Sequence, residues 1–162
     1  MVFTQRYASP LGNILLAADG QGLTGLWFDG AKYFAANLPE EREEKNTPIL
    51  AEAARWLDMY FAGRQPDFTP PLHLVGSDFR RRVWKRLLEI PYGQTAAYGQ
   101  LLGGGVSAQA VGGAVGHNPI SIIVPCHRVI GANGSLTGYA GGIEKKRRLL
   151  ALEGVDTTRI SD

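Results

Sequence analysis

The chain has 162 residues and a formal net charge of +2, with three histidines and a single cysteine, Cys126. This length is sufficient for a packed hydrophobic core, and a lone cysteine excludes both an internal disulfide and a zinc site of four cysteines. The apolar runs are too short to span a membrane and the first residues do not form a secretory signal, so we expect a cytoplasmic protein with no membrane partner.

The small net charge combines two halves of opposite sign. Residues 1–76 hold 9 acidic and 6 basic side chains, a net charge of −3, whereas residues 77–162 hold 6 acidic and 11 basic ones, a net charge of +5. The segment from Arg64 to Gly76 is rich in proline and weakly patterned, which is typical of a connection. We therefore predict an N-terminal domain at residues 1–76 and a C-terminal domain at residues 77–162.

The first half predicts a small α/β domain. Apolar segments alternate with turns rich in Gly, Asp, Ser and Pro, and this spacing indicates a three-stranded antiparallel sheet. The segments are residues 3–7, 14–18 and 23–28. We expect this domain to be structural, because it contains no motif with obvious chemistry.

An acidic segment and one helix complete the first half. Residues 40–45 are strongly charged, and we expect them to form a solvated loop or the end of a helix. Thr47 followed by Pro48 is a favoured start for a helix. Apolar residues then recur at helical spacing as far as Phe61, and Gly63 is expected to end the helix.

The second half begins with a basic helix, which we expect Ser77 to cap and Pro91 to end. The residues expected to face inward are Phe79, Val83, Leu87 and Leu88. The basic residues that crowd the rest of the helix are Arg80, Arg81, Arg82, Lys85 and Arg86. Such a cluster fits a nucleic-acid partner, and it equally fits a solvated helix face.

A pair of shorter helices is predicted next. Thr95 can cap a helix that runs to Leu102, and Ser107 can cap a second one over residues 108–115. Gly103 to Gly105 would form the turn between them. This outline matches a helix-turn-helix, although an ordinary pair of packed helices gives the same pattern.

The residues around Cys126 indicate chemistry. An apolar segment, residues 120–124, is expected to be short, buried and extended, and it precedes Cys126, His127 and Arg128. Positive or proton-accepting neighbours favour the thiolate, which is the nucleophilic form of cysteine. A lone cysteine is often only a small buried apolar residue, but the sequence Pro-Cys-His-Arg in this setting favours a reactive thiol.

Motifs between Ser77 and Gly154 resemble, in the same order, those of the O6-alkylguanine-DNA alkyltransferases, also called methylated-DNA–protein-cysteine methyltransferases. The motifs are residues 79–80 with 83–84, 90–95 with 98–99, 110–114, 118–119, 124–130, 138–142 and 149–154. The first half resembles the N-terminal domain of bacterial members in outline. The implied fold is α+β, with a small sheet-and-helix domain followed by a mainly helical, winged-helix-like domain that contains a helix-turn-helix.

The resemblance implies a DNA repair protein that acts once. It would flip an O6-alkylguanine out of double-stranded DNA and move the alkyl group irreversibly to its own Cys126. The resemblance implies no cofactor, no metal and no obligate protein partner, and it implies that the protein acts as a monomer.

The resemblance also assigns roles to individual residues. Cys126 would accept the alkyl group, His127 would take its proton through a water molecule, and Glu153 would orient the histidine. Tyr98 would donate a hydrogen bond to the leaving purine, and Asn118 would help to activate the cysteine. The residues implied to line the base pocket are Val129, Tyr139 and Ala140. The residues implied to contact DNA are Ala108, Gln109, Gly112, Gly113 and Arg128.

The sequence departs from the family pattern at two places. Gln109 stands where the family usually has an arginine that fills the gap left by the flipped base, and we expect it to fill this gap more weakly. The turn from Gly103 to Val106 is about three residues shorter than usual.

The residues leave alternatives open. A cysteine hydrolase could use the same Cys–His–Glu group, and it would turn over many times. A non-catalytic DNA-binding protein that senses alkylated bases is a further alternative, but members of that group lack the cysteine.

Overall fold

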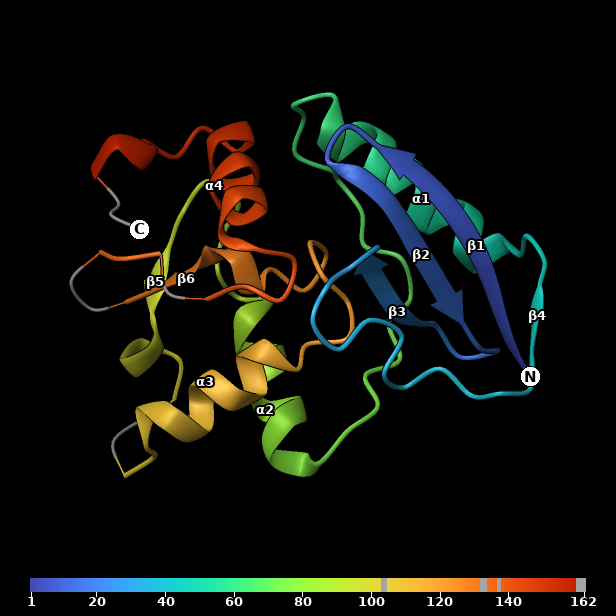
Figure 1. Ribbon diagram of the computed structural model, residues 1–162, viewed down its shortest axis with the longest axis horizontal. Coiled ribbons are helices and arrows are strands. Elements are labelled where there is room, and N and C mark those ends of the chain that lie inside the picture. Colours follow the sequence, from blue (N-terminus) through green and yellow to red (C-terminus); the bar gives the residue numbers. More distant parts are fainter. Residues whose placement is uncertain (103–104, 132–133, 137, 160–162) are drawn as a thin grey trace. The chain divides into compact units, whose positions relative to one another are not determined.

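The computed structural model describes residues 1–162 except 103–104, 132–133, 137 and 160–162. The chain forms two compact units with the mixed α and β content that the sequence predicted (Figure 1). Unit 1 comprises Met1–Val75 and Pro119–Ser121, and unit 2 comprises Gly76–Asn118 and Ile122–Asp162. In the part of the chain that the structure describes, no helix is long and apolar enough to cross a membrane.

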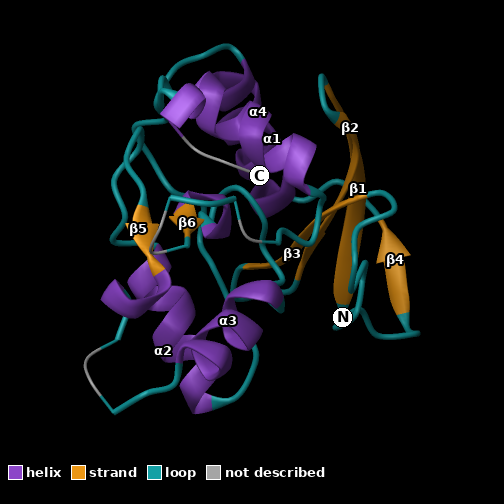
Figure 2. Cartoon of the chain, turned by 60° about the vertical axis from the view of Figure 1, so that its left-hand side comes forward, coloured by secondary structure: helices purple, strands orange, loops and turns teal. Residues whose placement is uncertain are grey.

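Within the described residues of unit 1, a four-stranded sheet has the order β3-β2-β1-β4. The strands are β1 (Val2–Ser9), β2 (Gly12–Ala18), β3 (Leu23–Phe28) and β4 (Arg42–Glu44). β1, β2 and β3 form the predicted antiparallel arrangement. β4 pairs in parallel with β1 at the edge of the sheet (Figure 2). The sequence missed β4, because its residues are all exposed and charged and show no alternation.

Helix α1 (Pro48–Phe61) covers one face of this sheet, and its limits are those that the sequence predicted. The Thr47 side chain accepts a hydrogen bond from the Leu50 amide at 3.3 Å, which satisfies one amide at the helix start. The apolar face is buried, and it consists of Leu50, Ala53, Trp56, Leu57 and Tyr60. Gly63 has a φ of 81°, a conformation that favours glycine and ends the helix.

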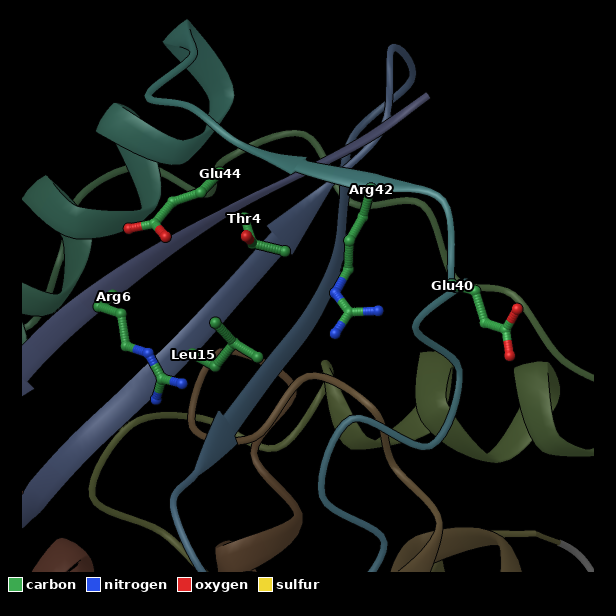
Figure 3. A pocket seen from close by; sticks show the side chains of 6 residues that line it. All are labelled: Thr4, Arg6, Leu15, Glu40, Arg42 and Glu44. Atoms are coloured by element: carbon green, nitrogen blue, oxygen red, sulfur yellow. The ribbon is translucent and has the colours of Figure 1, made fainter.

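The other sheet face is covered in part by the segment between β3 and β4. Leu15, Ala17 and Trp27 form a buried cluster there, against which Phe34 and Leu38 pack. Beside it lies a pocket of about 400 Å³ lined by Thr4, Arg6, Leu15, Glu40, Arg42 and Glu44 (Figure 3). Its lining holds two arginines and two glutamates, whose formal charges cancel, and neither histidine nor cysteine is among its lining residues.

Unit 2 is mainly helical in its described residues. Its helices are α2 (Asp78–Leu87), α3 (Ala108–Gly116) and α4 (Ile143–Leu152). Its short strands are β5 (Ala96–Ala97) and β6 (Val129–Ile130), which pair in parallel. Its 3₁₀ turns are η1 (Tyr98–Gln100), η2 (Cys126–Arg128) and η3 (Thr157–Arg159).

Helix α2 begins at its predicted cap, where the Ser77 hydroxyl accepts from the Arg80 amide at 3.2 Å. Val83 and Leu87 face the core as predicted, but Leu88 is 40% exposed, because the helix ends at Leu87 and the chain turns there. Trp84, and not Leu88, is the largest side chain that α2 buries in the core. Its indole Nε1 donates to the Ala114 carbonyl at 2.8 Å and so joins α2 to α3.

The predicted helix at 95–102 is wrong. Residues 96 and 97 instead form β5, and the 3₁₀ turn η1 follows. A pairing with β6, more than thirty residues away, decides this conformation, and local propensity does not reveal it. The second predicted helix is present as α3, and Ser107 caps it through the Ala110 amide at 3.0 Å. Gly103 and Gly104 of the predicted turn lie outside the described residues.

Candidate active site around Cys126

The segment that leads to Cys126 is buried, as predicted, but it is not extended. Only Ile120 makes a β-bridge, and residues 121–123 then form a turn. Ile122 has a φ of 70°, which is rare for a β-branched residue and strains the backbone. Cys126 opens η2, and its amide donates to the Val124 carbonyl at 2.8 Å. The turn was invisible to pattern analysis, because a run of β-branched residues favours a strand.

The Cys126 side chain lies almost entirely inside the protein, with 6% of the residue exposed. Burial raises the pKa of its thiol, while a hydrogen bond from the Asn118 side chain and the charge of Lys146 act in the opposite direction. The Asn118 amide group also donates to the Val124 carbonyl at 2.8 Å. Asn118 therefore fixes both the thiol and the backbone that precedes it.

Lys146 of α4 is a functional candidate that sequence reasoning missed. It is fully buried, and burial lowers the pKa of its ammonium group to about 8, against the opposing effect of Cys126. The signal was present in the sequence. Lys146 precedes Leu149 and Leu150 by three and four residues, so it belongs to the buried stripe of the helix.

His127 and Glu153 form a buried pair. The Nε2 atom of His127 lies 2.5 Å from Oε2 of Glu153, and neither side chain is exposed. Burial by itself raises the pKa of Glu153. The hydrogen bonds and charges of His127 and Arg128 outweigh this effect and lower the pKa to about 2. Burial lowers the pKa of His127. A carboxylate only accepts, so Nε2 carries the proton and Nδ1 is the basic nitrogen of a neutral imidazole.

Arg128 completes the charged cluster from the other side of Glu153. Its Nε donates to Oε1 of Glu153 at 2.8 Å, and its Nη1 donates to the Ile90 carbonyl at 2.7 Å. The Gly93 amide donates to the same Oε1 at 3.0 Å, and the guanidinium lies over the Tyr92 ring. Glu153 thus joins η2, the end of α4 and the turn after Ile90.

The remaining predicted residues lie around this cluster or on α3. Tyr98 is half-buried in η1, and a Cβ built on Gly112 would lie 3.8 Å from its ring. Val129 is fully buried in β6, and Tyr139 and Ala140 are half-buried before α4. The structure therefore gathers Cys126, His127, Asn118, Glu153 and Arg128 into one cluster, and it places Tyr98 beside α3.

The residues predicted to contact DNA fall into two groups. Ala108, Gln109 and Gly113 are exposed on α3 and Gly112 is half-buried, so this helix offers an uncharged face with little side-chain bulk. Arg128 differs from them, because only 8% of it is exposed and it is bonded to Glu153. No group of three or more His, Cys, Asp or Glu residues that could hold a metal ion occurs in the described parts of the chain.

Two family models together match most of the chain. The model "6-O-methylguanine DNA methyltransferase, ribonuclease-like domain" matches residues 2–74. The model "6-O-methylguanine DNA methyltransferase, DNA binding domain" matches residues 78–155. The two matches are separated by residues 75–77, at the end of the proline-rich segment, and otherwise leave only residue 1 and residues 156–162 unmatched.

Named relatives are similar over nearly the whole chain. The methylated-DNA–protein-cysteine methyltransferase of Mycobacterium bovis is 47% identical over 159 residues, which is 94% of this chain and 93% of that protein. The protein of the same name from Methanosarcina acetivorans is 47% identical over 151 residues, 91% of this chain and 96% of that protein.

Solved structures agree with these relatives. The Mycobacterium tuberculosis O6-methylguanine methyltransferase has a TM-score of 0.82 and 47% identity, and the match covers 94% of this chain and 93% of that one. A structure of Mycobacterium tuberculosis OGT in complex with DNA has a TM-score of 0.83 and 44% identity over 98% of this chain and 95% of that one.

Proposed function

The chain belongs to the methylated-DNA–protein-cysteine methyltransferase family, and from this premise we propose that Cys126 is the residue that receives the alkyl group. The protein repairs DNA by transferring an alkyl group to a cysteine of its own. One observation carries the assignment. The sequence contains a single cysteine, and this cysteine lies beside a buried His–Glu pair.

Proton transfer from Cys126 to His127 is the first step that we propose. Nδ1 of His127 accepts the thiol proton, directly or through a water molecule, while the Glu153 carboxylate holds Nε2 and stabilises the imidazolium that forms. The buried ammonium of Lys146 and the amide group of Asn118 stabilise the thiolate. This support is needed because burial otherwise favours the neutral thiol.

The thiolate then attacks the alkyl carbon of O6-alkylguanine. A sulfur–carbon bond forms, the carbon–O6 bond breaks, and the electron pair leaves with the guanine, to which the Tyr98 hydroxyl donates a hydrogen bond. A second attack by water is not needed, and the thioether formed on Cys126 is stable. Each molecule is therefore used once.

The burial of Cys126 dictates how the substrate reaches it. A guanine inside a duplex cannot approach a side chain that is 6% exposed, so the base must be flipped into the protein. We propose that Val129, Tyr139 and Ala140 line the pocket that receives it. The residues of α3 that we propose to meet the duplex are Ala108, Gln109, Gly112 and Gly113.

Arg128 acts within the protein in this proposal. Its bonds to Glu153 and Ile90 favour a positioning role over the direct DNA contact that the family resemblance implied. Residues 77–162 carry DNA binding and alkyl transfer, since all the groups named above come from them. These groups come from one chain, which suits a monomer. We place the protein in the cytoplasm because its substrate is cellular DNA.

The stoichiometry of the reaction tests this proposal. The protein is mixed with an excess of duplex DNA that carries O6-methylguanine with a labelled methyl group, and peptide mapping locates the label. We expect the label to stop at one equivalent, on Cys126, and a Cys126→Ser variant to accept none. Continued release of labelled product would indicate a cysteine hydrolase. Repair by Cys126→Ala would exclude Cys126 as the acceptor.

A further inference from the structure

A short segment of the chain after α3 adds to the sheet of unit 1. The Leu26 amide donates to the Pro119 carbonyl at 2.9 Å, and the Ser121 amide donates to the Leu26 carbonyl at 3.0 Å. Leu26 and Ile120 form a parallel β-bridge between these bonds. Both main-chain polar groups of Leu26 are thus directed to Pro119–Ser121, which extends the sheet beyond β3.

The same segment belongs to the loop that delivers Cys126. Asn118 directly precedes it and closes the loop through its 2.8 Å hydrogen bond to the Val124 carbonyl. Ile122 directly follows it, in a left-handed conformation that a β-branched residue rarely adopts. The Cys126 amide in turn donates a hydrogen bond to the Val124 carbonyl. Asn118, whose side chain hydrogen-bonds the thiol, therefore directly precedes the paired segment, and the strained Ile122 directly follows it.

We propose that β3, by pairing with Pro119–Ser121, sets the register of the Cys126 loop and so positions the thiol for alkyl transfer. This inference rests on the proposed function of Cys126, and it gives the N-terminal unit a role in the reaction rather than a purely structural one. A strained residue such as Ile122 persists only where its surroundings hold it. Without the pairing, the loop relaxes and the sulfur leaves the line of attack.

Two variants of Leu26 separate the pairing from the packing. Leu26→Ala and Leu26→Pro both remove the same buried side chain, but only proline also removes the amide that donates to Pro119. This amide points away from β2, so its loss leaves the β2–β3 hydrogen bonds in place. The variants therefore differ mainly in the bond that the proposal requires.

The measurement is the single-turnover rate of methyl transfer at saturating DNA, with DNA affinity measured separately. Both variants are studied below their unfolding temperatures, as monitored by circular dichroism. We expect Leu26→Ala to react within about threefold of the wild-type rate and Leu26→Pro to react roughly ten- to a hundredfold more slowly, since displacements of about 1 Å have effects of this size. DNA affinity is expected to be equal in both.

Equal transfer rates for the two folded variants overturn the positioning role and leave the proposed function intact, whereas failure of the proposed function shows as no transfer in the wild-type protein. If Leu26→Pro does not fold, hydrogen exchange of the wild-type protein decides the matter. The proposal expects the amides of Leu26, Ser121 and Cys126 to open together in a denaturant series. Separate, easier opening of Cys126 overturns it.

Discussion

Replacing Glu153 by glutamine perturbs the centre of the charged cluster without changing its size. Oε1 accepts from Arg128 and from the Gly93 amide, so the amide oxygen of the glutamine must occupy that place. The amide NH₂ group then faces Nε2 of His127, where Oε2 lies in the wild-type protein. Nε2 has to accept, and the ring proton moves to Nδ1. The nitrogen that should take the proton of Cys126 is no longer basic.

The loss of the carboxylate also has a stability effect that can be worked from its pKa. The pKa of Glu153 is lowered from 4.5 to about 2, and at 1.36 kcal/mol per unit this corresponds to about 3 kcal/mol. Glu153 contributes this stability fully above the pKa of an unfolded glutamate and loses it as the pH falls toward 2. We therefore expect Glu153→Gln to lower the free energy of unfolding by about 3 kcal/mol at pH 7, and the difference to shrink below about pH 4.

Two assays check these effects on the same variant. Urea unfolding at several pH values gives the stability difference, and single-turnover transfer from O6-methylguanine DNA gives the rate. We expect the rate to fall by about 10³- to 10⁴-fold, as expected for a histidine held in the wrong tautomer. A rate within threefold of wild type, or a stability difference below about 1 kcal/mol at pH 7, would refute the roles assigned to Glu153.

Three further substitutions test other groups. Lys146→Met removes a buried ammonium group whose pKa is lowered to about 8, so we expect the free energy of unfolding at pH 7 to rise by up to about 3 kcal/mol. Cys126 should also react more slowly with iodoacetamide, and its pH–rate profile should move to higher pH. An unchanged profile would remove Lys146 from the site. Gln109→Arg adds a charge to an exposed position of α3, and we expect tighter DNA binding with a salt dependence steeper by about 0.9 in the log–log slope; identical slopes would place residue 109 away from the DNA. Arg128→Gln should slow transfer and leave the salt dependence of DNA binding unchanged, whereas a shallower slope would indicate a direct phosphate contact.

Local signals located the helices whose ends depend on neighbouring residues. Thr47 with Pro48, and Ser107, mark helix starts through hydrogen bonds that span only three residues, so the sequence contains all the information they need. The predictions of a helix at 95–102 and an extended segment at 120–124 are wrong for the opposite reason. β5 depends on β6, and Ile120 depends on Leu26, and these are partners that sequence periodicity cannot reveal.

The sequence by itself offered a single thiol as the candidate acceptor, because the chain has one cysteine, and His127 must be its neighbour. The role of Glu153 follows only from the resemblance to a family, and Lys146 is not among the residues that the sequence predicted. Tertiary structure decided the chemical state of the thiol. It brings a carboxylate 26 residues away to within 2.5 Å of His127 and buries an ammonium near Cys126. Charges act strongly where water is excluded, and only folding decides which charges are enclosed together.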